Sequence, residues 1–336
     1  MRSAARSWRR SSSCGPARIP PTRSPPSCSS GSRSPHRPLH GRTAQDPQRK
    51  DPALRPAPAA AAGHRRTSVS TTTISDTSAG TSSTHTAVLV EQAGPVRRIR
   101  LNRPERRNAI DPELIEALDA AVADAMADAG TQVIVISGNG PGFCAGADLH
   151  HLLDLARSGA DPTGFLTRIS DCFTRLETDP KPVIAAVHGH VVAGGLELAL
   201  ACDAVVAEEG SFIGDGHIRN NLLPGGGSSY RLPRKVGEPL ARRLMLTGEL
   251  LPAEHFLPSG FVQAVAPAGE FEATVKEAAE SFAGGETSGQ GRMKALLADP
   301  ETASAMRREL ETFAEHWREQ DIAAKLIHFF DTRGVR

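Results

Sequence analysis

His188-Gly-His-Val-Val-Ala-Gly194-Gly195-Leu-Glu197-Leu-Ala-Leu-Ala-Cys202-Asp203 follows the short apolar run Pro182–Val187. The run predicts a buried strand, and the leucines after the glycine pair predict a helix. Glycines at such a junction let atoms of another molecule approach bare backbone N–H groups. The first N–H groups of a helix have no partner inside it, and the helix dipole adds partial positive charge. The stretch therefore predicts a site for an anion, or for a carbonyl oxygen that becomes one.

Glu197 adds a second chemical group to the same turn. It lies three residues after Gly194, so its carboxylate can return toward the exposed N–H groups. A carboxylate there is a candidate proton carrier.

A second glycine-rich stretch, Gly138-Asn-Gly-Pro-Gly-Phe-Cys-Ala145-Gly-Ala147-Asp148-Leu149, follows the apolar run Gln132–Ser137. The run predicts another buried strand, consistent with a parallel β-α-β arrangement. Asp148 is placed to cap a helix that begins near Leu149. Such a loop can serve tight packing alone, but its occurrence ahead of the Gly194 stretch favours a functional role.

These two stretches resemble, in order, the two oxyanion motifs of the enoyl-CoA hydratase/isomerase (crotonase) superfamily. The first is similar to the family's FCAGADL motif, and the second to its glycine donor followed by a glutamate. The resemblance implies that the backbone N–H groups of Ala147 and Gly194 polarise a thioester carbonyl and stabilise the enolate. It also implies substrate contacts for three residues of the first motif: Ala145, Asp148 and Leu149.

The segment Asn102-Arg-Pro-Glu-Arg106-Arg107-Asn108 is similar to the family's LNRPxxxNA loop, which lies against the nucleotide end of coenzyme A. The resemblance implies that Arg106 and Arg107 meet phosphate groups of the substrate. For each arginine taken singly, an ordinary solvated turn is the alternative.

The third family signature shows a departure. In hydratases a second glutamate stands seven residues before the proline of a PG pair, and here that position holds His217, before Pro224. Histidine titrates near neutrality and is a plausible acid/base partner for Glu197. Asp215 is placed to orient the histidine or to face solvent. We expect His217 to face Glu197 and to give the activity a pH limb near neutrality, subject to burial and to the charge of Glu197.

The resemblance implies an α/β fold: the crotonase-like ββα-repeat fold, with two stacked sheets and C-terminal helices that form trimers, often paired as hexamers. We expect an extension over residues 1–85, a core over 86–270 and a helical oligomerisation segment over 271–336. Asp299-Pro300 predicts a helix start. The helices from Phe271 onward have no obvious sheet of their own to cover, so we expect six residues to be buried between subunits: Leu296, Leu297, Met306, Leu310, Phe313 and Trp317.

The charge of the chain is unevenly distributed. Residues 1–85 hold 14 basic and three acidic residues, whereas the remaining 251 residues hold 25 basic and 35 acidic ones. The Arg-, Ser- and Pro-rich extension has too little apolar periodicity for a packed core, which predicts disorder. It is typical of an organelle transit peptide, of a basic tail, or of a functionless extension. We expect a cytoplasmic protein, or one of an organelle matrix if the extension is a transit peptide, with free thiols and no membrane span.

These features predict an enzyme that acts on acyl-CoA through an enolate, with no cofactor other than the coenzyme A of the substrate. Hydration of a 2-enoyl-CoA by Glu197 and His217 is the leading hypothesis. Double-bond isomerisation, and hydrolytic carbon–carbon cleavage of a β-diketone, are alternatives, although Gly226 stands where such hydrolases carry an acid. A non-catalytic or RNA-binding role is the remaining alternative, and the acidic core argues against it.

Overall fold

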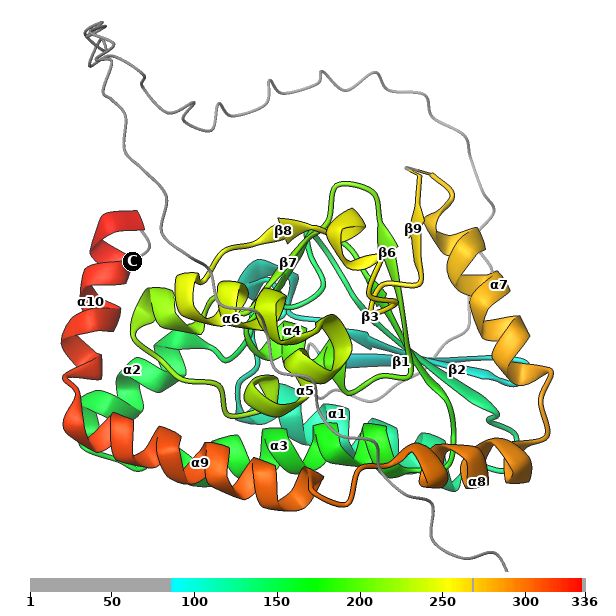
Figure 1. The fold of residues 1–336 in the computed structure, drawn as a ribbon, viewed down its shortest axis with the longest axis horizontal. Helices are drawn as coiled ribbons and strands as arrows, with labels where there is room; N and C mark the ends of the chain where they lie inside the picture. The colour runs from blue at the N-terminus through cyan, green and yellow to red at the C-terminus, as the bar shows by residue number, and fades with distance from the viewer. Residues whose placement is uncertain (1–85, 268, 334–336) are drawn as a thin grey trace, which may run out of the picture. The chain divides into compact units, whose positions relative to one another are not determined.

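The computed structural model describes residues 86–267 and 269–333, and the predicted extension over residues 1–85 lies outside the described residues. A six-stranded sheet runs in the order β1-β2-β3-β4-β6-β9 and forms the centre of the core (Figure 1). β1 and β2 form an antiparallel hairpin, and every further neighbour in this sheet is parallel. The strands are β1 (Val88–Ala93), β2 (Val96–Leu101), β3 (Val133–Gly138), β4 (Val183–Val187), β6 (Ala204–Glu208) and β9 (Ala264–Ala266).

The central strands β3, β4 and β6 are buried on both faces of the sheet, which explains their continuous apolar runs. Ile134 and Ile136 of β3 join the main core, together with buried residues of α1 (Pro112–Ala127) and α3 (Thr163–Thr178). Val133 and Val135 point to the opposite face and form a second core. Asp111 caps α1 by accepting a hydrogen bond from the backbone N–H of Leu114 at 2.9 Å.

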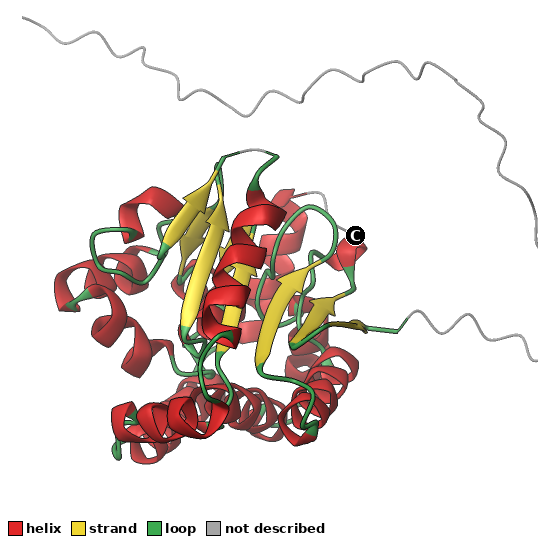
Figure 2. Cartoon of the chain, turned by 90° about the vertical axis from the view of Figure 1, so that its right-hand side faces the viewer, coloured by secondary structure: helices red, strands yellow, loops and turns green. Residues whose placement is uncertain are grey.

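The second core corrects one expectation about the C-terminal segment. Val275 and Ala279 of α7 (Phe271–Ala283) are buried against this second face of the sheet, in the same cluster as Val133 and Ile184. α7 therefore has a sheet of its own chain to cover, as its position along the strands also shows (Figure 2). Its apolar spacing predicts the helix that forms, but spacing alone does not identify the surface that the helix covers.

The Gly194 stretch adjoins a second, smaller sheet. It consists of β5 (His190–Val192), β7 (Phe212–Gly214) and β8 (Leu251–Pro252), in the order β5-β7-β8. α4 (Gly194–Leu200) starts directly after β5, and all of its residues are buried. The remaining elements ahead of the C-terminal helices are the 3₁₀ helices η1 (Pro104–Arg106), η2 (His217–Asn220) and η3 (Ala253–Phe256), with α2 (Leu149–Ser158), α5 (Ser228–Val236) and α6 (Glu238–Thr247).

The last three helices are α8 (Thr287–Leu297), α9 (Thr302–Glu319) and α10 (Ile322–Arg333). Met306 and Phe313 of α9 are buried within the chain, and Leu310 and Trp317 pack against its main core. These four residues were expected between subunits, but their own chain buries Met306 and Phe313 and partly buries Leu310 and Trp317. Only Leu296 and Leu297 of the expected set are exposed. Asp299 does not cap α9, since the helix begins at Thr302 with Glu301 at its N-cap.

Among the described residues, no helix is both long enough and apolar enough to cross a membrane. Cys144, Cys172 and Cys202 are buried free thiols.

Candidate active site

Glu197 is buried one turn inside α4, where its carboxylate has a fixed orientation. Its Oε1 accepts hydrogen bonds from the backbone N–H groups of Gly226, at 2.8 Å, and Ser228, at 3.1 Å. Its Oε2 lies 3.8 Å from Nε2 of His217. One oxygen is thus held by the protein, and the other faces the histidine and the cavity.

Two candidate oxyanion donors lie close together at the start of this helix. A side chain on Gly146 would place its Cβ 2.9 Å from the Gly194 nitrogen, and one on Gly194 would place its Cβ 3.4 Å from the Ala147 nitrogen. Within the described residues, neither the Ala147 nor the Gly194 N–H donates a hydrogen bond. Gly195 has no room for a side chain either, since a Cβ there would stand 2.2 Å from the carbonyl oxygen of Cys144. These glycines bring the two loops into contact and leave two N–H groups available to a substrate oxygen.

Ala193 connects β5 to α4 in a backbone conformation that is unusual for a residue with a side chain. Its φ is 53° and its ψ is −119°, which costs of order 1–3 kcal/mol. Two backbone hydrogen bonds stabilise this turn: Ala193 N–H donates to Gly214 at 3.2 Å, and the N–H of Glu197 donates to Ala193 at 3.0 Å. The turn places Gly194 at the first position of the helix, at the cavity wall.

His217 begins η2, and a chain of contacts orients its ring. Its Nδ1 lies 3.0 Å from Oδ1 of Asp215, and Oδ2 of Asp215 accepts the hydroxyl hydrogen bond of Ser228 at 2.6 Å. Because an ionised carboxylate only accepts hydrogen bonds, Nδ1 is the donor in this contact. Asp215 is therefore an orienting partner of His217, buried at 1% exposure rather than facing solvent.

Burial and the neighbouring charges together raise the pKa values of both Glu197 and His217. Burial raises the pKa of Glu197 to about 7, opposed by the positive charge of His217 and reinforced by nearby Glu309. Burial opposes the charge on His217, but Asp215 and Glu197 outweigh it and raise its pKa to about 9. His217 in turn keeps the pKa of Asp215 below its usual range despite burial. The two groups therefore titrate as a coupled pair with both pKa values raised, and not as a histidine that changes charge at its ordinary pKa near neutrality.

A cavity of about 80 Å³ adjoins this pair. Two of the predicted substrate contacts, Ala145 and Leu149, line it. The two predicted oxyanion donors, Ala147 and Gly194, and the pair Glu197 and His217 line it as well. The rest of its wall is mostly apolar and is formed by Leu152, Leu166, Ile169, Leu222, Leu223 and Phe313. Since Phe313 belongs to α9, the C-terminal segment closes the cavity of its own chain.

The remaining predicted residues lie outside this cavity. Asp148 caps α2 by accepting from the His150 N–H at 2.9 Å, and its other oxygen pairs with Arg103 at 3.2 Å. Arg106 is exposed, with Nη1 3.3 Å from Nδ1 of His150. Arg107 is exposed as well, in the left-handed region with a φ of 52°.

Asn108 is a further residue of this site, and it was not among the predicted site residues. Its buried side-chain amide donates to the carbonyl oxygens of Asn139, Gly142 and Phe143, and it thereby holds the loop that carries Ala147. Its position in the LNRPxxxNA-like segment was the available signal. Among the described residues, no cluster of His, Cys, Asp and Glu is arranged to hold a metal ion.

Two convergent backbone donors beside an acid/base pair in an apolar cavity are typical of an enzyme that stabilises an oxyanion or enolate. Comparison with known proteins agrees: the chain belongs to the enoyl-CoA hydratase/isomerase family, whose model matches residues 91–335. A putative enoyl-CoA hydratase of Thermus thermophilus is 36% identical over 249 residues, which are 73% of this chain and 98% of that protein. The 2,3-dehydroadipyl-CoA hydratase of Escherichia coli is 38% identical over 182 residues, which are 54% of this chain and 69% of that protein.

Solved structures give the same result for the fold. An enoyl-CoA hydratase from Mycobacterium avium subsp. paratuberculosis superposes with a TM-score of 0.66 at 28% identity, covering 72% of this chain and 98% of that one. The predicted crotonase-like α/β fold and family are therefore confirmed.

Proposed function

We propose that this protein is an acyl-CoA enzyme that adds water across the double bond of a 2-enoyl-CoA, with coenzyme A as part of the substrate and no further cofactor. The observation that carries the proposal is the pairing of Glu197 with His217, 3.8 Å apart, beside the free N–H groups of Ala147 and Gly194. Relatives named as enoyl-CoA hydratases support the choice of reaction.

The proposed chemistry uses one charged form of each group. The thioester oxygen binds between the N–H groups of Ala147 and Gly194, which stabilise negative charge on it. Ionised Glu197 takes a proton from water as the hydroxyl adds to the β-carbon, and the double-bond electrons move onto the thioester oxygen. Protonated His217 then gives its Nε2 proton to the α-carbon as the enolate collapses. The products are a 3-hydroxyacyl-CoA, protonated Glu197 and neutral His217.

The short distance between Glu197 and His217 also allows the proton to return from the glutamate to the histidine after each turnover. Oε2 of Glu197 and Nε2 of His217 are 3.8 Å apart, so a water at about 2.8 Å from each can carry the proton back. Asp215 favours this return because it stabilises the positive charge on His217.

This assignment predicts a bell-shaped dependence of kcat/KM on pH. Activity should fall below about pH 7, where Glu197 becomes protonated, and above about pH 9, where His217 loses its proton. Both limbs are properties of the coupled pair. Initial rates measured across both regions check the prediction. In Asp215→Asn the upper limb should move to lower pH, and a flat profile through both regions would contradict the assignment.

We extend the proposal to the assembly, as a homotrimer or a dimer of trimers. It is supported by three exposed apolar side chains of α8, Met293, Leu296 and Leu297, which are 66%, 82% and 85% exposed. Exposed leucines at adjacent positions favour an interface. Light scattering at micromolar concentration should give the mass of a trimer or hexamer. The double variant Leu296→Glu, Leu297→Glu should give a smaller particle mass. A monomeric wild-type protein would rule the proposal out.

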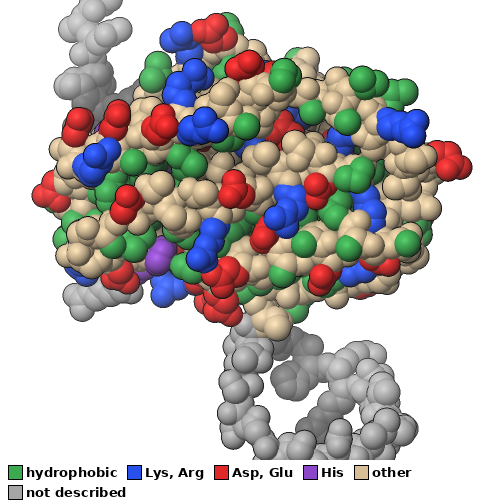
Figure 3. All heavy atoms as spheres, turned by 90° about the horizontal axis from the view of Figure 1, so that it is seen from below, with side chains coloured by type: hydrophobic (Ala, Val, Ile, Leu, Met, Phe, Trp, Pro, Cys, Tyr) green, Lys and Arg blue, Asp and Glu red, His purple; other side chains and the backbone are tan. Residues whose placement is uncertain are grey.

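We do not propose a nucleic acid as partner. The 251 residues after the extension have ten more acidic than basic residues. On the face that carries α8 and α9, acidic and basic side chains are interspersed (Figure 3). A surface of this kind does not favour a polyanion.

A further inference from the structure

The segment from Gly226 to Ser229, called the glycine loop below, binds two buried carboxylates. Its successive backbone N–H groups donate alternately to one carboxylate and to the other. The N–H groups of Gly226 and Ser228 donate to Oε1 of Glu197, at 2.8 and 3.1 Å. The N–H groups between and after them, of Gly227 and Ser229, donate to Glu309 at 2.6 and 2.8 Å, and the Ser229 hydroxyl also donates to Glu309. Glu309 belongs to α9, so a C-terminal helix takes part in fixing this loop.

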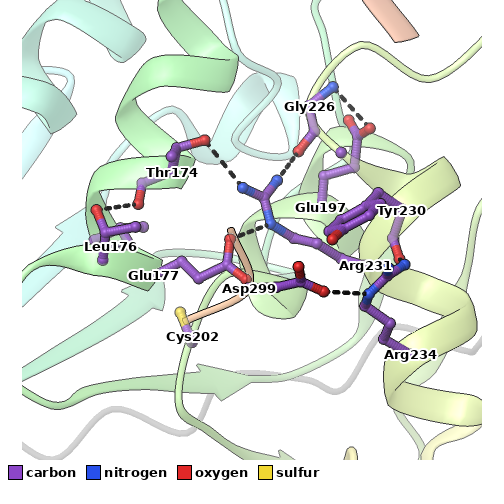
Figure 4. Close-up of polar contacts among 12 residues, drawn as sticks. Thr174, Leu176, Glu177, Glu197, Cys202, Gly226, Tyr230, Arg231, Arg234 and Asp299 are labelled. Carbon is purple, nitrogen blue, oxygen red and sulfur yellow. Dashed lines mark hydrogen bonds and ion pairs between the residues drawn. The ribbon is translucent and has the colours of Figure 1, made fainter. Parts of the chain in front are cut away.

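Arg231 holds the same loop from the other side. Its side chain is 1% exposed, and its Nη1 donates to the carbonyl oxygen of Gly226 at 2.7 Å. Its Nε donates to Glu177 at 2.9 Å, and its Nη2 donates to the hydroxyl of Thr174 at 3.1 Å (Figure 4). These partners fix the guanidinium in one position beneath the loop.

The peptide bond between Gly226 and Gly227 is consequently held at both ends. Its carbonyl oxygen accepts from the Arg231 cation, and its N–H donates to the Glu309 anion. Hydrogen bonds to charged groups are about twice as strong as neutral ones. Gly227 has a φ of 105°, and a Cβ there would stand 1.9 Å from Nη1 of Arg231. The loop therefore closely encloses the arginine.

We infer that Arg231 and Glu309 are positioning residues for the acid/base pair: they clamp the Gly226–Gly227 peptide so that its neighbours hold Oε1 of Glu197 and leave Oε2 facing His217. Neither residue touches the proposed reacting atoms. The inference rests on the proposed role of Glu197 as the proton carrier.

Electrostatics connect Glu309 to the pair as well. After burial and His217, Glu309 is the next influence on Glu197, and it raises the pKa of Glu197; it raises the pKa of His217 too. The other ionisable groups around Glu197 are Asp215 and His217, before and on η2, Arg231 on α5, and the thiol of Cys144. Removing the charge of Glu309 should therefore lower both pKa values.

The test compares Glu309→Gln with Glu311→Gln, an exposed glutamate on the same helix. We expect Glu309→Gln to lower kcat by roughly 10- to 100-fold with little change in KM, because a displaced acid/base group slows the chemical step. Both limbs of its pH profile should move to lower pH. Arg231→Gln should lower kcat by a similar factor. Arg231→Lys should lower it less, because the lysine keeps a cation at Gly226. Arg234→Gln, on the same helix, is the control and should leave kcat and the pH profile unchanged.

A second measurement needs no substrate and separates this inference from the proposed reaction. Infrared titration of the ligand-free enzyme follows the protonated carboxyl band of Glu197, identified by its loss in Glu197→Gln. In Glu309→Gln that band should disappear at lower pH than in the wild type, whatever reaction the enzyme catalyses. If folded Glu309→Gln keeps the wild-type titration and kcat, the clamp does not position Glu197. If it does not fold, an unchanged kcat and pH profile in Arg231→Gln overturns the inference.

Discussion

Glu197→Gln should nearly abolish turnover while the protein remains folded. The amide has almost the same shape, and its oxygen can still accept the hydrogen bonds that Gly226 and Ser228 donate to Oε1. It cannot take a proton from water at Oε2, beside His217. Loss of a positioned proton carrier should lower kcat by roughly 10²–10⁴-fold.

The measurement is steady-state hydration of short 2-enoyl-CoA thioesters, followed by the loss of the enoyl absorbance and by mass detection of the product. Circular dichroism and the thermal midpoint should match those of the wild type, with Glu311→Gln as the control for a surface change. The infrared band of the buried carboxyl should vanish. Near-normal turnover in the variant would remove Glu197 from the mechanism.

The sequence was most informative where one short segment contains all the functional groups of a predicted feature. The Gly194–Glu197 turn places an N–H donor and a carboxylate in one helix, so their proximity follows from helix geometry alone. The position of His217 followed from a count to Pro224, and the structure brings it to Glu197. Strands such as β3 and the cap at Asp111 were predictable for the same local reason.

The parts that could not be predicted depend on contacts between distant segments. Glu309 reaches the glycine loop only because α9 packs beside α5, and nothing in its local sequence marks it as different from Glu311. The pKa of His217 likewise depends on Asp215 and Glu197 together, since their charges outweigh the effect of burial. The sheet face that α7 covers was invisible for a similar reason, because helical spacing identifies an apolar stripe and not its partner.

His217→Ala should remove most of the rate, because the variant lacks the acid that protonates the α-carbon. It should also lose the limb near pH 9, because only one group of the coupled pair then remains to titrate. The remaining limb should move to higher pH, since the histidine's charge lowers the pKa of Glu197 in the wild type. His217→Gln is the matched variant, because its amide can still donate to Asp215 and keep that buried carboxylate hydrogen-bonded.

His217→Glu distinguishes the reactions that remain open. The new carboxyl would face Glu197 and lie near Asp215, and these like charges favour its protonated form, which can donate a proton to the α-carbon. If the native reaction is hydration, wild type and variant should both hydrate crotonyl-CoA, with the wild type at least as fast. A poor wild-type hydratase and a better glutamate variant would mean that the native reaction is a different one. Unchanged rates and pH dependence in His217→Ala would leave Glu197 as the single acid/base group, and double-bond isomerisation would then be the better assignment.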